Sequence, residues 1–279
     1  MAYNRCVEKM KIGIIGSGVV GEATGKAFGH FDNEVTFCDI NHDTLKRLHQ
    51  EGLSVADNTP LLVQESDVVF ICVNTPTIKD GIQDLRALQS VLDDVVMGLN
   101  ELDSHTIIIV KSTILPETSE RIVQHLKQTT QHQNWDYFYN PEFLTANNAL
   151  SDTLYPDRVV IGGILKNNWN VIDKLFDWWR CPIVKTGYTE AEMIKYVSNC
   201  FLSTKISFFN EMGEISKTLK LDVKMIEEAV SLDKRIGKYG TESGRAFRGT
   251  CLPKDTLAFH KKFNTDILER VLEINDSIS

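Results

Sequence analysis

A cysteine and an acid one helical turn apart, Cys251 and Asp255, are the residues of this sequence that most directly indicate chemistry. Pro253 suits the first position of a helix, so we expect Cys251 at a helix N-terminus, where unpaired N–H groups and the positive dipole end favour a thiolate. Lys254 adds a cation close by in sequence. The functional interpretation is a nucleophilic thiol, and the alternative is a buried structural cysteine beside a surface Lys–Asp pair.

Lys195 and Asn199 form a second chemical pair, four residues apart on an expected long helix, so their side chains are neighbours. A lysine on a stripe that continues through Leu202 and Ile206 requires a partner. A cation and an amide donor can stabilise a developing oxyanion, as acyl or hemiacetal chemistry at a thiol requires. The alternative is a lysine that extends along apolar surface to water, beside a satisfied amide.

A glycine-rich turn with the sequence Gly16-Ser17-Gly18-Val19-Val20-Gly21 follows the first predicted strand and opens a helix. The first two glycines permit a tight turn and the close approach of a pyrophosphate, and the third permits close packing of helix on strand. Asp39, at the end of the second strand, suits the ribose hydroxyls of NAD and repels the 2′-phosphate of NADP. The sequence therefore predicts NAD binding by Gly16, Gly18, Val19, Val20, Gly21 and Asp39.

Polar residues follow three later strands, in the order Asn74-Thr75-Pro76, Lys111-Ser112-Thr113 and Asn140-Pro141-Glu142. Each group is also ordinary turn chemistry. In a doubly wound sheet, however, the carboxyl edge of the strands is the ligand crevice, so three such groups indicate a site there.

Short β-branched runs that alternate with helical patterns must position these residues. The strands are expected at 12–15, 35–37, 68–73, 106–110, 137–139, 159–161 and 182–184. They are apolar throughout, as in a parallel sheet covered by helices on both faces. The fold class is therefore α/β, with a Rossmann-type doubly wound parallel sheet over residues 10–188.

Residues 189–279 are expected to form an all-α domain. Thr189-x-x-Glu192 has the pattern of a capping box ahead of a long helix that reaches Leu219, and a second helix is expected at 223–232. A Gly-rich loop at 236–250 and two short helices ending near Asn275 follow. Apolar residues cover more than one face of the long helix, which indicates burial against a second domain or the second subunit of a homodimer.

Composition excludes several classes of function. The 279 residues carry a formal charge of -8, so neither a nucleic acid nor an acidic membrane surface is an expected partner. Six cysteines without a CxxC pair indicate a reducing cytoplasm and no structural zinc. Residues 1–10 hold no apolar leader, and no apolar run approaches the length of a membrane span.

Together the motifs resemble the UDP-glucose/GDP-mannose dehydrogenase family. The resemblance rests on segments in family order along almost the whole chain: Gly16-x-Gly18-x-x-Gly21, Asp80-Gly81-x-x-Asp84-Leu85, Lys111-Ser112-Thr113, Asn140-Pro141-Glu142-Phe143-Leu144, Pro156-Asp157-Arg158-Val159-Val160-Ile161-Gly162, Lys195-x-x-x-Asn199, Arg235-Ile236-Gly237 and Cys251-Leu252-Pro253-Lys254-Asp255-Thr256.

The resemblance implies oxidation of a nucleotide sugar to its carboxylate by two NAD through a cysteine-bound thiohemiacetal and thioester, with UDP-glucose as the first expected substrate and acidic polysaccharide precursors as the product class. It implies a layout like that of 6-phosphogluconate dehydrogenase. The implied catalytic residues are Cys251, Lys195, Asn199, Asp255, Glu142 and Thr113. NAD would also contact Val73, Asn74, Thr75, Ser112 and Thr113, and the substrate would contact Phe143, Leu144, Lys195, Asn199, Arg235 and Gly249, with Arg235 reaching it across a dimer interface.

The sequence also departs from the family. The chain ends at Ser279, where the family continues into a nucleotide-binding domain, so that domain is expected to be absent. Glu117 and Arg248 stand where the family has glycine, and Thr145-Ala146-Asn147 replaces Arg-Glu-Gly. Two alternatives therefore remain: a β-hydroxyacid dehydrogenase, which needs no cysteine, and a truncated NAD-binding subunit or weakly active scaffold.

Overall fold

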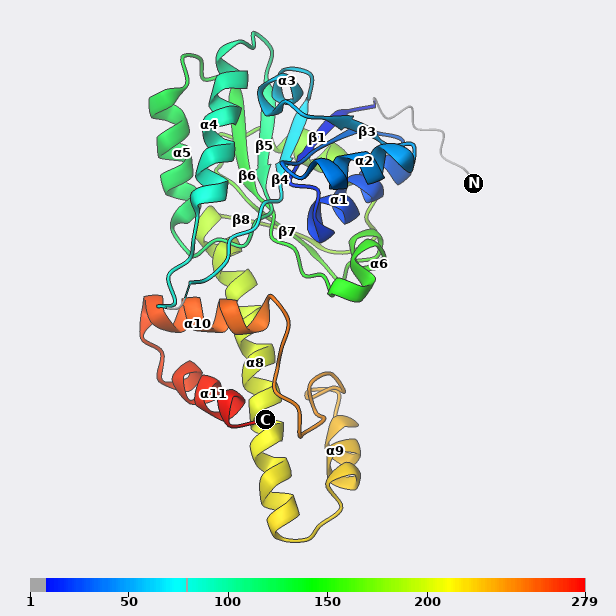
Figure 1. The fold of residues 1–279 in the computed structure, drawn as a ribbon, viewed down its shortest axis with the longest axis vertical. Helices are drawn as coiled ribbons and strands as arrows, with labels where there is room; N and C mark the ends of the chain where they lie inside the picture. The colour runs from blue at the N-terminus through cyan, green and yellow to red at the C-terminus, as the bar shows by residue number, and fades with distance from the viewer. Residues whose placement is uncertain (1–8, 79, 279) are drawn as a thin grey trace. The chain divides into compact units, whose positions relative to one another are not determined.

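The computed structural model describes residues 9–78 and 80–278 and divides the chain into two compact units (Figure 1). Unit 1 contains the chain up to Thr75 together with Leu85–Met193, and unit 2 contains Pro76–Asp84 and the chain from Ile194 onward. Cys6, counted among the six cysteines above, lies outside the described residues. The domain bounds 10–188 and 189–279 stay a prediction, because the division into units falls inside one helix and adds an early segment to unit 2.

Unit 1 is built on an eight-stranded, mostly parallel sheet with the strand order β3-β2-β1-β4-β5-β6-β7-β8. The order reverses beside β1, as in a doubly wound fold, and the predicted fold class is confirmed. The bounds are β1 Lys11–Ile15, β2 Glu34–Cys38, β3 Ser54–Ala56, β4 Val68–Ile71, β5 Thr106–Val110, β6 Trp135–Tyr139, β7 Val159–Gly162 and β8 Ile183–Thr186. The prediction missed β3, because three residues that begin with a serine carry no apolar run.

The expectation of a parallel sheet is wrong for the last two strands. β7 pairs with β6 in antiparallel fashion through Tyr139 and Gly162, and β8 is parallel to β7. The connection between β6 and β7 holds only a 3₁₀ turn, Ala146–Asn148, and the six-residue helix α6, Ala149–Leu154. Six helical residues span about 9 Å, whereas a five-residue strand spans about 17 Å, so this helix cannot return the chain to the opposite edge.

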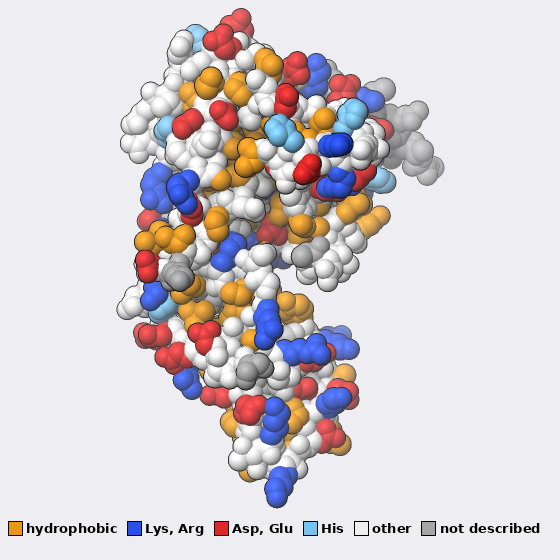
Figure 2. All heavy atoms as spheres, in the orientation of Figure 1, with side chains coloured by type: hydrophobic (Ala, Val, Ile, Leu, Met, Phe, Trp, Pro, Cys, Tyr) orange, Lys and Arg blue, Asp and Glu red, His pale blue; other side chains and the backbone are white. Residues whose placement is uncertain are grey.

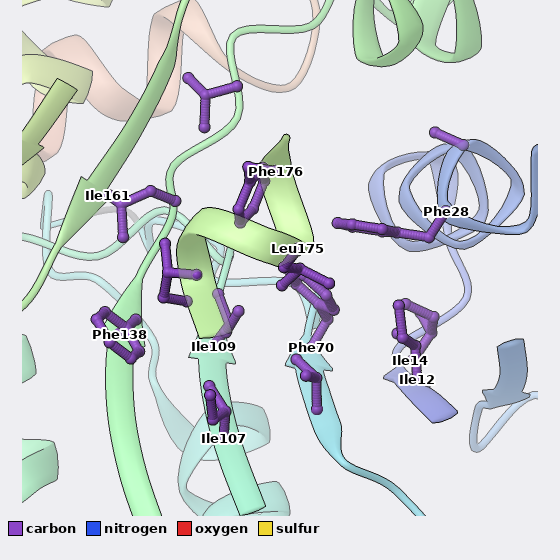
Figure 3. Close-up of a cluster of buried hydrophobic side chains, with 14 of the residues drawn as sticks. Ile12, Ile14, Phe28, Phe70, Ile107, Ile109, Phe138, Ile161, Leu175 and Phe176 are labelled. Carbon is purple, nitrogen blue, oxygen red and sulfur yellow. The ribbon is translucent and has the colours of Figure 1, made fainter. Parts of the chain in front are cut away.

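Helices cover both faces of the sheet. Figure 3 shows one side of the core, where Phe28 of one helix and Phe176 of another pack over side chains from β1, β4, β5 and β6. Phe28 lies 5.0 Å from Phe70 between ring centroids. The helices of unit 1 are α1 Val19–His30, α2 His42–Gln50, α3 Thr59–Gln64, α4 Arg86–Asn100, α5 Thr118–Thr129, α6 and α7 Trp169–Phe176. A core of this size fixes the carboxyl ends of the strands, where the candidate residues lie.

Unit 2 is organised along the long helix α8, Tyr188–Thr218, as the sequence predicts. The other helices are α9 Val223–Ser231, α10 Leu252–Phe263 and α11 Asp266–Ser277. Ser203 accepts a hydrogen bond from Thr256 of α10 at 2.8 Å, and Ser207 donates to the Val271 carbonyl of α11 at 3.1 Å. Small buried hydroxyls on α8 therefore allow α10 and α11 to pack closely against it.

The predicted capping box at the start of α8 is wrong. α8 begins at Tyr188, so Thr189 lies inside the helix, and Glu192 is fully buried. The Glu192 carboxylate accepts hydrogen bonds from the backbone N–H groups of Glu117 and Ser119, both at 2.7 Å. These groups open α5, so Glu192 caps a different helix of unit 1, where a carboxylate suits the positive dipole end.

Candidate functional site

The turn between β1 and α1 requires glycine at two positions. Gly16 has a φ of +89°, and a Cβ on it would lie 2.8 Å from the Cys72 carbonyl oxygen. A Cβ on Gly21 would lie 1.9 Å from the Gly16 carbonyl oxygen. Both contacts are to backbone, which cannot move aside easily, so these glycines hold the turn closed by close packing.

Gly18 differs from these two glycines because a Cβ on it would meet nothing within 4 Å. Gly18 is the N-cap of α1 and makes no side-chain cap hydrogen bond, and the side chain of Val19 is exposed. The space beside Gly18, at the N-terminal end of α1, is therefore open. This geometry fits the close approach of a dinucleotide pyrophosphate, the role expected of Gly18, Val19 and Val20.

Asp39 follows β2 at the same edge of the sheet. Its Oδ2 accepts a hydrogen bond from the Ser17 N–H at 2.6 Å, and its Oδ1 accepts one from the Asn41 N–H at 2.8 Å. Each carboxylate oxygen can accept a further hydrogen bond, so the side chain is oriented yet still able to bind hydroxyls. The residues present therefore fit the ribose of NAD.

The segments after β4 and β5 are joined to each other by hydroxyl side chains. Ser112 donates to the Val73 carbonyl at 2.7 Å, and Thr75 donates to the Thr113 carbonyl at 2.6 Å. Asn74, between them, is exposed. The five residues that were expected to contact the cofactor here, Val73, Asn74, Thr75, Ser112 and Thr113, are thus brought together in unit 1.

The segment after β6 carries a buried acid above a cavity. Glu142 accepts a hydrogen bond from the Leu144 N–H at 2.6 Å. The neighbouring Lys111 ammonium donates to the Asn140 side-chain oxygen at 2.9 Å, and the Arg158 guanidinium lies 3.9 Å above the Phe143 ring. The cavity has a volume of about 290 Å³, and its lining includes Lys111, Glu142, Phe143, Leu144, Phe176 and Trp179.

In unit 2, Asp255 is the centre of a polar cluster. Only 1 % of it is exposed, its Oδ2 accepts from the Asn199 amide at 2.7 Å, and its Oδ1 pairs with the Lys254 ammonium at 2.5 Å. A buried carboxylate held by a cation and an amide donor is oriented for proton transfer or for binding water. Lys195, one turn before Asn199, is also buried.

Cys251 lies at the start of α10, as the N-cap, and its side chain is exposed. Leu252, not Pro253, is the first residue of the helix, which moves the predicted start by one position. The Cys251 Sγ lies 3.7 Å from the Thr250 hydroxyl. Burial raises the pKa of Cys72 and of Cys200 to about 12, so these two thiols are poor nucleophiles at neutral pH.

Two loop residues of unit 2, Arg235 and Gly249, were also expected to contact the substrate. Arg235 is largely exposed and forms an ion pair with Asp233 at 2.6 Å, which holds the pKa of that carboxyl below its usual range. Gly249 has a φ of +87°, and a Cβ on it would meet nothing within 4 Å. The space beside its backbone is therefore open, and the expected contact with the substrate stays a prediction.

The sequence interpretation underestimated Lys254 and missed Tyr196. Lys254 was noted only as a cation near the thiol, whereas its ammonium binds Asp255. Tyr196 is fully buried, and its hydroxyl accepts from the Gln83 side chain at 3.2 Å. Tyr196 lies three residues before Asn199, on the same face of the helix, and this spacing could have indicated that Tyr196 lies near the cluster. No local pattern links Tyr196 to Gln83.

Figure 2 shows basic and acidic side chains interspersed over the visible face of the chain, with hydrophobic side chains between them. The formal charge of -8 is therefore not concentrated in one field on that face. No helix in the described ranges is both long enough and apolar enough to cross a membrane.

Comparisons with known proteins agree on one family. Residues 48–180 match the model of the UDP-glucose/GDP-mannose dehydrogenase family, NAD binding domain, and residues 189–277 match that of its central domain. The UDP-glucose 6-dehydrogenase TuaD of Bacillus subtilis is 31% identical, over 95% of this chain and 63% of its own length. The chain thus spans about two thirds of the length of such relatives.

Solved structures give the same result. A UDP-glucose dehydrogenase from Pyrobaculum islandicum superposes with a TM-score of 0.91 at 31% identity, over 99% of this chain and 70% of that one. A GDP-mannose dehydrogenase from Pseudomonas aeruginosa gives a TM-score of 0.76 at 27% identity, over 96% of this chain and 69% of that one. The nucleotide and sugar therefore differ among proteins that share this fold.

Proposed function

Because the chain belongs to the UDP-glucose/GDP-mannose dehydrogenase family and its residues fit NAD, we propose that it oxidises a nucleotide sugar through a cysteine-bound intermediate. UDP-glucose is the proposed substrate and UDP-glucuronate the product. The observation that carries the proposal is the cluster in unit 2, where Asn199 and Lys254 hold Asp255 one turn beyond the exposed Cys251. A hydride-transfer enzyme without a covalent step needs no exposed thiol at this position.

NAD, held by the residues of unit 1, would supply the oxidant: two NAD molecules, bound one after the other, would each take one hydride from the same carbon of the sugar. In the first oxidation, the sugar hydroxyl loses its proton to Asp255, aided by Lys195, and an aldehyde forms. The Cys251 thiolate then adds to the aldehyde carbon, which creates a C–S bond and an oxyanion that Lys195 and Asn199 stabilise. Loss of the second hydride leaves a thioester.

Hydrolysis of the thioester completes the reaction. Water adds to the thioester carbon, the C–S bond breaks, and the carboxylate leaves Cys251 free again. Glu142 is proposed to move the proton in these later steps, and Thr113 to position the water. The hydrogen bond from the Leu144 N–H supports the role of Glu142, because it keeps that carboxylate oriented.

The proposal includes a homodimer formed through α8. One face of α8 carries exposed hydrophobic side chains, Val197 at 53%, Phe201 at 63%, Phe208 at 52% and Ile215 at 48%. Their spacing of four, seven and seven residues places them on one line along the helix. A second copy that buries this line would also remove four large apolar groups from water. Arg235, which is exposed and paired with Asp233, is proposed to contact the substrate of the second copy.

The dimer is tested by measuring the molar mass in solution of the wild type, Phe208→Glu and the control Leu165→Glu. Leu165 is 99% exposed in unit 1, so the control introduces the same charge far from α8 in sequence. A dimeric wild type and control with a monomeric Phe208→Glu support the proposal. A monomeric wild type refutes it.

A cytoplasmic location is likewise proposed, supported by the free state of the five described cysteines.

The activity is tested by counting NADH formed per UDP-glucose consumed, with GDP-mannose as a second substrate. Two NADH per sugar are expected, with turnover lost in Cys251→Ser and kept in the control Cys181→Ser. One NADH on a hydroxyacid and full activity in Cys251→Ser would favour a β-hydroxyacid dehydrogenase instead. NAD binding without turnover of any nucleotide sugar would favour an NAD-binding subunit.

A further inference from the structure

The segment Pro76–Asp84, here called the strap, follows the cofactor segment in sequence yet belongs to unit 2. It is a closed hairpin, in which Thr77 and Gln83 pair in antiparallel fashion and the Asp84 N–H donates to the Pro76 carbonyl at 2.7 Å. Gly81, at the turn, has a φ of +77°. The two ends of the strap are therefore held together, and residue 79, at its middle, lies outside the described residues.

The strap lies along one face of α10. The Thr77 hydroxyl donates to the Lys254 carbonyl at 3.1 Å. A Cβ on Gly81 would lie 2.2 Å from the Lys261 Cγ, so the two residues are packed as closely as a glycine permits. Lys254 and Lys261 are seven residues apart and therefore share a helix face two turns long. The strap thus supports the first turns of the helix that carries Asp255.

The strap also reaches α8. Gln83 donates to the hydroxyl of the fully buried Tyr196 at 3.2 Å, and the Tyr196 ring stacks on Phe259 of α10 with centroids 5.4 Å apart. Tyr196 directly follows Lys195 in α8. One hairpin therefore contacts both helices that supply the proposed catalytic residues of unit 2.

The other end of the strap is tied to the cofactor segment by a short, stiff link. The Thr75 hydroxyl donates to the Thr113 carbonyl within unit 1, and the Thr77 hydroxyl donates to the Lys254 carbonyl within unit 2. Two residues of chain span at most about 7 Å. Pro76 fixes its own φ and restricts the residue before it, so little slack separates the two anchors.

We propose that the strap transmits cofactor binding at Val73–Thr75 to the first turn of α10, with Thr77 and Tyr196 as positioning residues. The inference rests on the proposed function for the roles of the cofactor segment and of Asp255. NAD that contacts Val73–Thr75 restrains Thr75, the stiff link restrains Thr77, and Thr77 restrains the backbone carbonyl of Lys254. The helix start that carries Asp255 is thereby ordered when NAD is bound, before the sugar arrives.

Amide hydrogen exchange of the full chain with and without saturating NAD tests this coupling. In the wild type, NAD is expected to slow exchange about fivefold in peptides covering 252–258, the effect of one hydrogen bond worth about 1 kcal/mol. Thr77→Val, which keeps the shape and removes the hydroxyl, is expected to bring that factor below about twofold. Thr77→Ser, which keeps the hydroxyl, is expected to preserve it. The dissociation constant of NAD should change less than about twofold in either variant.

Tyr196→Phe provides a second variant, since it removes the hydroxyl that accepts from Gln83 and keeps the ring that stacks on Phe259. It is expected to lower kcat about fivefold with an unchanged KM for NAD. NAD-independent exchange at 252–258 in the wild type, or equal behaviour of Thr77→Val and Thr77→Ser, would overturn the inference. Protection by NAD without oxidation of any nucleotide sugar would support the strap while refuting the proposed function.

Discussion

Gly18 and Gly21 lie three residues apart in one turn, but Gly21 is needed for packing and Gly18 leaves space for a ligand. Substitution of each by alanine distinguishes the two roles. Gly21→Ala places a methyl 1.9 Å from the Gly16 carbonyl oxygen, whereas Gly18→Ala places one in open space. The first change must therefore move α1 against β1. The second leaves the protein packing intact and obstructs only a ligand that approaches the helix N-terminus.

The two expected magnitudes follow from these contacts. Overpacking costs about 1–3 kcal/mol, and because the obstructing atom is backbone we expect at least about 2 kcal/mol for Gly21→Ala, or a loss of roughly 4–8 °C in Tm. In Gly18→Ala, alanine is a slightly poorer N-cap than glycine, which lowers the free energy of unfolding, but it also makes the unfolded chain less flexible, which raises it. The free energy of unfolding should therefore stay within about 0.5 kcal/mol of the wild-type value. Its NAD affinity should fall roughly 10–100-fold, because charge-assisted hydrogen bonds to the pyrophosphate are worth about 1.5–3 kcal/mol.

Thermal unfolding and calorimetric NAD titration of both variants and the wild type give the two quantities independently. The expected pattern is a stable Gly18→Ala that binds NAD poorly beside a destabilised Gly21→Ala. Equal losses of stability in the two variants would refute the assignment of packing to Gly21 alone. An unchanged NAD affinity in Gly18→Ala would refute the placement of the pyrophosphate.

Three further outcomes follow from single residues. Glu117 has a φ of +75° at an exposed position, so Glu117→Gly should exceed the control Glu117→Ala in free energy of unfolding by about 1 kcal/mol, measured by urea titration. Glu192→Gln should lower the free energy of unfolding by about 2 kcal/mol or more in the same assay, because the NH₂ group of glutamine would face one of the two backbone N–H donors. An unchanged urea midpoint would contradict the capping role of Glu192. Iodoacetamide at pH 8 should label Cys251 well before Cys72 and Cys200, whose pKa of about 12 leaves them protonated until the pH rises toward that value, and peptide mass spectrometry locates the label.

The positions of the candidate site residues in unit 1 could be predicted from sequence, because they follow from local patterns. Gly16, Gly18 and Gly21 fall in one turn, and the residues that follow β4, β5 and β6 meet at one edge as a consequence of parallel pairing. The errors arose where the deciding contact was distant in sequence. Glu192 matched a local capping pattern, but its carboxylate binds the start of α5 more than seventy residues away.

The sequence by itself determined the doubly wound fold, the glycine turn after β1 and the types of the proposed catalytic residues. Strand periodicity, glycine conformation and side-chain chemistry are properties of short segments. Only the tertiary structure decided which groups hold Asp255, why Cys251 is the accessible thiol while Cys200 is buried, and that Pro76–Asp84 packs on α10. Hydrogen-bond partners and burial depend on which segments meet in space, and a linear pattern carries that information only when the partners lie within a few turns of each other.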